Sequence, residues 1–191
     1  MPWVAAVWGP HEAAIAALPK VELRRALPDQ GRYAAGAPFD LLIHCAGPVP
    51  NGLVALGEKV WAGEVETVRP RIGTDECAVT LVALMRRAPA LTAEEFAVHW
   101  REHHAPLALR HHEGLHDYAQ HLVVRELVRL DSEPVDGVAE LGFVTRADLE
   151  TRFYDSDEGR TAIGVDVRRF MAGPGPDSTL LGPPGAEKRS G

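Results

Sequence analysis

The sequence predicts an α+β fold in which two successive segments each run in the order β-α-β-β-α-β. Short apolar runs alternate with short amphipathic runs over 191 residues, a length that suits one domain or two small ones. The two β-rich segments meet near Arg71–Asp75, where the chain divides. Hydrophobic residues make up 46% of the chain and charged residues 25%, as in ordinary globular proteins, which argues against a disordered or fibrous chain.

The first segment, residues 1–72, is expected to contain four strands and two short helices. Its strands are apolar runs bounded by turn residues, and we expect them at Pro2–Trp8, Val21–Leu27, Phe39–Cys45 and Val65–Arg71. The helices are expected at Glu12–Leu18, which is rich in alanine, and at Leu53–Lys59. This order of elements makes the segment a candidate for one half of a duplicated fold.

The second segment begins with a strand at Cys77–Met85, whose near-continuous apolar run is typical of a strand buried on both faces. A helix is expected to follow, because Thr92 and Glu95 have the spacing of a capping box. The apolar stripe of this helix consists of Phe96, Trp100, His103 and Leu107. Pro106 lacks the N–H that a helix needs, so the helix should kink or end near His104–Ala105.

The second segment is expected to cover residues 75–172, and the rest of it is expected to alternate between strands and helices. The remaining strands and helices are expected at Tyr118–Leu127, Val138–Val144, Ala147–Phe153, Asp157–Met171 and, as a weak final strand, Ser178–Leu181. Residues 173–191 contain five glycines and four prolines, which predicts a flexible tail apart from that possible short strand.

Composition argues against several classes of partner. The 20 Lys and Arg residues are outnumbered by 27 Asp and Glu residues, and an acidic surface repels phosphate backbones, so we expect no nucleic-acid partner. No run approaches the roughly 18 apolar residues of a membrane span, so we expect no membrane partner. The N-terminus lacks the basic region of a signal peptide and two cysteines make no disulfide framework, so we expect a cytoplasmic protein.

The second segment carries several short motifs. They are Leu84-Met85-Arg86-Arg87, Thr92-Ala93-Glu94-Glu95-Phe96, Asp117-Tyr118-Ala119-Gln120, Asp136-Gly137-Val138-Ala139-Glu140-Leu141 and Asp155–Gly159. Between the second and third lies His99-Trp100-Arg101-Glu102-His103-His104-Ala105-Pro106-Leu107, which is similar to a Tyr-Trp-x-x-x-His-(Gly/Ala)-Pro-Leu signature with histidine in place of tyrosine. In these motifs and their order, residues 77–171 resemble the EthD family, a branch of the dimeric α+β-barrel superfamily.

The resemblance implies a ferredoxin-like half whose sheet closes against a second sheet, with a pocket between the two. The second sheet usually comes from another subunit, so a homodimer is one expectation. Residues 1–72 could instead supply it as a degenerate ferredoxin-like half, which would give a barrel within one chain. The superfamily includes cofactor-free cyclases, dehydratases, lactone isomerases and haem-handling proteins, so the fold alone does not select a reaction.

The resemblance and the histidines together indicate a set of site residues. Seven of the nine histidines lie between His99 and His121, and His104 is the one that matches the signature. We expect His104 to act as general acid or base, because an imidazole titrates near neutral pH. Tyr118 would orient a substrate oxygen, and Glu140, a carboxylate in an apolar strand, would be a proton partner. The expected substrate contacts are Phe96, Trp100, His103, Gln120 and Asp136.

Each candidate also has a structural interpretation. His104 could hydrogen-bond a free carbonyl at the helix kink, and Tyr118 could be a half-buried strand residue. Asp136 could form the turn before Gly137, while the aromatic residues of the helix could belong to the core.

The sequence also contains a zinc-binding pattern, His-Glu-x-x-His, at His112-Glu113-Gly114-Leu115-His116. The pattern works only on a helix, and Gly114 together with the strand expected at Tyr118 predicts a turn instead. His99 and His103 have i, i+4 spacing but no clear third ligand. We therefore expect neither a metal site nor a cofactor.

The function expected from this reasoning is a cofactor-independent lyase, cyclase, dehydratase or isomerase. It would transfer protons on a hydrophobic, oxygenated small-molecule substrate of aromatic or polyketide-like type. One alternative is a non-catalytic ligand-binding or accessory protein. Another is a protein that binds haem or a metal through the histidine cluster.

Overall fold

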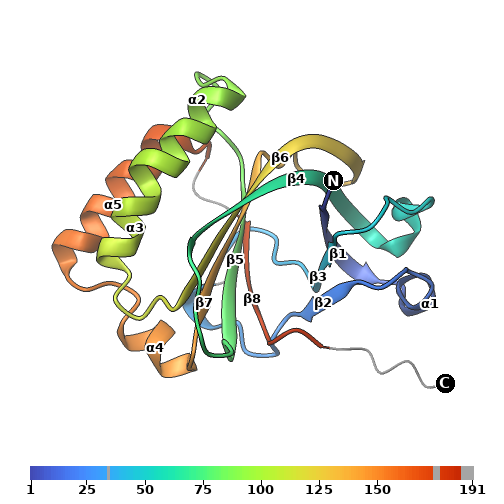
Figure 1. Ribbon diagram of the computed structural model, residues 1–191, viewed down its shortest axis with the longest axis horizontal. Coiled ribbons are helices and arrows are strands. Elements are labelled where there is room, and N and C mark those ends of the chain that lie inside the picture. The colour runs from blue at the N-terminus through green and yellow to red at the C-terminus, as the bar shows by residue number, and fades with distance from the viewer. Residues whose placement is uncertain (34, 174–176, 186–191) are drawn as a thin grey trace.

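The computed structural model describes residues 1–33, 35–173 and 177–185. Their strands form one antiparallel sheet of eight, in the order β2-β3-β1-β4-β6-β7-β5-β8 (Figure 1). The strands are β1 Trp3–Pro10, β2 Glu22–Arg25, β3 Leu41–Cys45, β4 Gly57–Arg71, β5 Val79–Met85, β6 Asp117–Leu130, β7 Gly137–Phe143 and β8 Asp177–Leu181.

The sheet curls until its two edge strands almost meet, which gives a nearly closed barrel. Beside β2 and β8, the Leu27 N–H donates to the Leu180 carbonyl at 2.9 Å, and the Gly182 N–H donates to the Arg25 carbonyl at 3.0 Å. These bonds occupy backbone groups that an open sheet edge would leave unpaired. The barrel is therefore built within one chain, as the N-terminal segment was expected to allow.

The helices lie outside this barrel. They are α1 Glu12–Ala16, α2 Ala93–Val98, the π-helical segment η3 His99–His104, α3 Ala105–His111, α4 Arg146–Thr151 and α5 Asp157–Phe170, with two 3-10 turns, η1 Gly31–Tyr33 and η2 Leu53–Leu56. Helices α2 to α5 lie on the side of β5, β6 and β7, and α1 lies on the opposite side (Figure 1). None of the helices in the described ranges has the length and apolar character needed to cross a bilayer.

Three apolar cores follow from this arrangement, because side chains alternate between the two faces of each strand. The barrel interior contains Val4, Ala6, Phe39, Leu42, Trp61, Val65, Val82, Leu84, Val135, Val138 and Leu181. A second core fills the space between the sheet and α2 to α5. A third lies beneath α1 and η2.

All eight predicted strands are present, and the prediction fails mainly at one boundary. A helix was expected over Leu53–Lys59, but η2 ends at Leu56 and β4 begins at Gly57. Strand β4 pairs with both β1 and β6, which links the two segments into one sheet. Strand orders β2-β3-β1-β4 and β6-β7-β5-β8 repeat one pattern, while the division into two ferredoxin-like halves stays a prediction.

The helix does not end at Pro106, which corrects one of the two outcomes expected there. Residues His99–His104 adopt a π-helix, and the Ala105 N–H donates to the Trp100 carbonyl five residues back. Pro106 then stands in the first turn of α3, where the absent N–H is tolerated. The π-helical turn thus lets the chain continue as a helix through the proline.

The capping box predicted at the start of α2 is confirmed. Thr92 Oγ1 accepts from the Glu95 N–H at 3.1 Å, and Glu95 Oε2 accepts from the Thr92 N–H at 2.7 Å. We expect Thr92→Ala to lower the free energy of unfolding by about 1 kcal/mol, since it removes the cap. Urea denaturation would measure the loss, with Thr92→Ser as the variant that keeps the hydroxyl. An unchanged midpoint in Thr92→Ala would contradict this role.

Candidate functional site

Three chemically active side chains from three strands point into one end of the barrel. Glu140 lies between two residues of β7 that face the helices, and His121 lies between two such residues of β6. In β3, the neighbours of His44 face α1, so the His44 side chain points to the other face of the sheet. Strand parity therefore directs all three into the interior, at the end that we call the barrel mouth.

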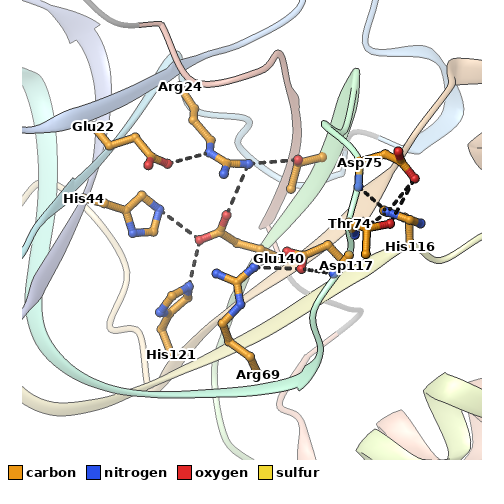
Figure 2. A network of polar contacts seen from close by, with 12 residues as sticks. Glu22, Arg24, His44, Arg69, Thr74, Asp75, His116, Asp117, His121 and Glu140 are labelled. Atoms are coloured by element: carbon orange, nitrogen blue, oxygen red, sulfur yellow. Dashed lines mark hydrogen bonds and ion pairs between the residues drawn. The ribbon is translucent and has the colours of Figure 1, made fainter.

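These side chains converge on a single carboxylate oxygen (Figure 2). His121 Nε2 lies 2.8 Å from Glu140 Oε1, and His44 Nε2 lies 2.9 Å from the same atom. The other nitrogen of His121, Nδ1, lies 2.8 Å from Thr67 Oγ1, and Thr67 stands opposite His121 in the β4–β6 register. We call Glu140, His44, His121 and Arg24 the mouth cluster.

Arg24 brings a positive charge to the second oxygen of the carboxylate. Its Nη1 lies 3.7 Å from Glu140 Oε2 and donates to Thr80 Oγ1 at 3.0 Å. Its Nε donates to Glu22 Oε1 at 3.0 Å. The guanidinium is thus fixed on three sides and shares its charge between two carboxylates.

Glu140 is 6% exposed, yet its surroundings keep it ionised. Burial by itself would raise the pKa of this carboxyl. The interactions of the carboxylate with the His44 and His121 imidazoles outweigh burial, so the pKa of Glu140 lies well below its usual range. The mouth cluster therefore holds, between two imidazoles, a carboxyl group that favours its ionised form.

A cavity of about 670 Å³ opens above the mouth cluster. Its polar lining includes His44, His121 and Thr67, and its apolar lining includes Trp3 and Val65. Glu140 lies beneath the two imidazoles. A cavity of this volume and mixed lining is typical of a small-molecule site.

His104 lies in the helical layer, on the opposite side of the sheet from this cavity. Its Nδ1 lies 2.9 Å from Asp166 Oδ2 on α5, and His99 Nε2 lies 2.9 Å from Asp166 Oδ1. Its ring packs on Phe170 with centroids 5.0 Å apart. Burial lowers the pKa of His104, and the Asp166 carboxylate only partly offsets this. His104 therefore does not line the pocket that the resemblance implied between the two sheets, which corrects its expected place in the site.

Tyr118 also lies on the helix-facing side, in a buried network with Trp100 and Gln120. Trp100 Nε1 donates to Tyr118 Oη at 3.2 Å, and Gln120 Nε2 donates to the same oxygen at 3.0 Å and to the Trp100 carbonyl at 3.1 Å. Burial raises the pKa of Tyr118 to about 12. Tyr118 and Glu140 thus lie on opposite faces of the sheet and do not share a cavity.

The remaining predicted contacts are also separated from the barrel mouth. Phe96 packs with Trp100 in the core beneath the helices. His103 is exposed on η3, with its ring 5.3 Å from that of His99. Asp136 Oδ1 accepts from Arg87 Nε at 2.9 Å, which fixes the turn before β7. Of the predicted residues, the structure places Glu140 alone in the mouth cluster.

Sequence reasoning missed Arg24, His44, His121 and Thr67 as members of one site. The signal that singled out Glu140, a polar residue within an apolar strand, applies equally to His44 in Leu41–Cys45. His121 alternates with Tyr118 and Gln120 along β6 and therefore lies on the opposite face of the sheet. Their convergence depends on pairing between distant strands, which no local pattern in the sequence contains.

The His-Glu-x-x-His pattern forms a turn, as predicted. His112 Nδ1 donates to the Phe153 carbonyl at 2.6 Å. His116 Nε2 accepts from the N–H groups of Thr74 and Asp75, both at 3.0 Å (Figure 2). The two imidazoles are therefore engaged by different segments.

His112 should make stability depend on pH. Burial lowers its pKa to about 4, against about 6.5 for an unfolded histidine. The unfolded chain then binds more protons between these values, so the contribution is full above pH 6.5 and decreases as the pH falls toward 4. We expect a loss of about 3 kcal/mol across this window. Urea denaturation of the unaltered protein and of His112→Asn at several pH values would measure this loss. Both proteins contain His104, so the difference between their pH curves gives the contribution of His112. Parallel pH curves would contradict this expectation.

These features define an α+β protein with a nearly closed barrel and a buried carboxylate–imidazole cluster at its mouth. Residues 88–174 match the family model described as EthD domain, which confirms the resemblance for this part of the chain. A solved structure described as "Crystal structure study of anthrone oxidase-like protein" aligns with a TM-score of 0.54 and 16% identity, covering 95% of this chain and 90% of that chain. At this identity the likeness concerns the fold. Comparison with curated protein sequences gives no match.

Proposed function

We propose that the protein is an EthD-like enzyme whose barrel mouth binds a hydrophobic, oxygenated small molecule and removes a proton from a carbon that its carbonyl group acidifies, either directly next to the carbonyl or through an aromatic ring. Cyclisation, dehydration or isomerisation can follow from such a step. The observation that carries the proposal is the carboxylate of Glu140 held at 2.8 and 2.9 Å from two imidazoles that line an open cavity. This moves the reaction expected from the sequence to a different site in the same chain.

The lining of the cavity supports this chemistry. Apolar side chains such as Trp3, Val4 and Val65 would hold the carbon skeleton and exclude water. Proton loss from such a carbon places negative charge on the carbonyl oxygen, and an imidazole N–H of the cavity lining would stabilise that charge. His44, the more exposed imidazole, is proposed to accept the proton, with Glu140 holding its charged form.

The structural neighbour suggests a first probe. It is described as anthrone oxidase-like. An anthrone is an aromatic ketone whose methylene group lies across the central ring from the carbonyl, and the methylene is acidic because the charge left by proton loss reaches the carbonyl oxygen through the fused aromatic rings. A cavity of about 670 Å³ is within the range of drug-sized ligands. Anthrone and its hydroxylated derivatives are therefore the molecules with which we would begin.

The proton-transfer step can be tested without knowing the final product. Chelator-treated protein in D₂O is expected to accelerate deuterium exchange at the methylene carbon of an anthrone, measured by NMR. His44→Gln should lower the catalysed rate by about 100-fold or more, since it removes the proton acceptor. His11→Gln, which changes an exposed residue before α1, is the matched control and should keep the rate.

His104→Gln provides the competing arm of this experiment. Loss of exchange in His104→Gln with full exchange in His44→Gln would overturn the proposal and place the reaction in the helical layer. Binding of the probe in the cavity with no exchange above the uncatalysed rate would favour a non-catalytic ligand-binding protein. The latter is the second candidate because His104 and Tyr118, the catalytic residues expected from the family motifs, lie outside the barrel mouth.

A further inference from the structure

The mouth cluster contains the donor set of a metal site. We propose that His44, His121 and Glu140 together bind one divalent transition-metal ion through the two Nε2 atoms and Oε1. The inference concerns the site named under the proposed function, and it does not depend on the proton-transfer step. It departs from the expectation that the protein uses no metal.

The spacing of the donor atoms fits a bound ion. Glu140 Oε1 lies 2.8 Å from His121 Nε2 and 2.9 Å from His44 Nε2, and all three donors lie within 4.8 Å of one another. An ion with bonds of about 2.0–2.1 Å in tetrahedral or octahedral geometry has its donors roughly 2.9–3.4 Å apart. Small side-chain adjustments would therefore complete the site while the strands stay in place.

His44 Nε2 supplies a second observation. It is a buried nitrogen without a well-aligned hydrogen bond among the described residues, although Glu140 Oε1 is close. His121 already makes an aligned hydrogen bond to that oxygen. A buried polar atom whose neighbour is poorly aligned for a hydrogen bond gains little from that contact. A metal ion between the three donors would satisfy this atom.

The groups around the donors are also those of a metal site. Imidazole ligands commonly donate their second N–H to a neighbouring oxygen, and Thr67 Oγ1 lies 2.8 Å from His121 Nδ1. The Thr67 hydroxyl can accept from the N–H of a metal-bound imidazole and donate to the opposite tautomer. Arg24 approaches the other carboxylate oxygen, Oε2, and shares its charge with Glu22, which leaves Oε1 for the ion.

The chemical class of the ion follows from the donors and from the cavity. Two imidazoles and one carboxylate suit Zn²⁺ or Fe²⁺, and three protein ligands leave further positions for other molecules. His44 and His121 line the cavity of about 670 Å³, so those positions would face a bound small molecule. An ion there would polarise an oxygen of that molecule.

Metal binding can be measured on the full chain without any substrate. Co²⁺ is titrated into chelator-treated protein and followed by visible absorption, and Zn²⁺ competition and elemental analysis give the stoichiometry. We expect one ion per chain. His121→Gln should weaken binding by about 100-fold or more, and Thr67→Val, which keeps the side-chain shape, by about 10-fold. His11→Gln should bind as the unaltered protein does.

The outcomes separate this inference from the proposed function. Absence of Co²⁺ and Zn²⁺ uptake would overturn the metal site, and exchange by the metal-free protein would still support proton transfer. Metal uptake by a protein that catalyses no deuterium exchange, whether metal-free or metal-bound, would support the metal site and contradict the proposed reaction. Uptake that survives His121→Gln but is lost in His103→Gln would assign the ion to the exposed helical histidines and overturn the inference. Circular dichroism of each variant establishes that it is folded.

Discussion

Replacing Trp100 with alanine is expected to lower the free energy of unfolding by about 3–5 kcal/mol. The indole is 0% exposed and packs between η3 and the sheet. Its Nε1–H donates to Tyr118 Oη, so the substitution opens a cavity and also removes a hydrogen bond inside the core. Gly137 leaves room for the ring, because a Cβ at that position would lie 2.5 Å from Trp100 Cζ3.

Urea denaturation at pH 7.5 would measure this loss. Trp100→Phe keeps much of the ring volume and is expected to lose less stability than Trp100→Ala. Gly137→Ala is expected to be destabilising by about 1–3 kcal/mol, since the added methyl group presses on the indole. A change below about 1 kcal/mol in Trp100→Ala would show that this part of the core does not depend on the ring.

Glu140→Gln is expected to reduce proton exchange at the barrel mouth by about 100-fold or more. Glutamine has nearly the same shape but no charge, so it cannot stabilise a protonated imidazole at His44 or His121. The substitution also leaves the Arg24 guanidinium without its buried counter-charge. The deuterium-exchange rate of an anthrone, measured at saturating probe, tests this expectation.

The control for this prediction is Glu126→Gln, which removes a carboxylate paired with Arg129 on the surface. The Glu126→Gln protein should catalyse deuterium exchange of the anthrone at the same rate as the unaltered protein. Thermal unfolding should be recorded for both variants, so that a loss of folded protein is not taken for a loss of chemistry. Full exchange by folded Glu140→Gln would exclude the carboxylate from the reaction.

The strands could be predicted because they are encoded locally. Runs such as Cys77–Met85 are apolar on both faces, and in the structure β5 is buried along its whole length. The first turn of α2 was predicted from two side chains three residues apart. Such patterns involve only residues close together in the sequence, so they can be recognised without knowledge of the tertiary structure.

The site could not be predicted in the same way. His44, His121 and Glu140 come from β3, β6 and β7, and they meet only after the barrel has closed. The candidates on the helix-facing side were chosen from family motifs, and in the structure the residues of these motifs build the core. Gly137, for example, leaves room for the ring of Trp100. The π-helical turn before Pro106 likewise depends on hydrogen bonding that the proline alone does not specify.

Closure of the barrel within one polypeptide has a consequence for selectivity. When two identical subunits form a barrel, twofold symmetry repeats every side chain across the axis. Here Arg24 and His44 come from the first segment, and His121 and Glu140 come from the second. A guest molecule therefore meets different chemistry at its two ends, so one orientation can be favoured over its reverse, and each half can evolve without imposing the same change on the other.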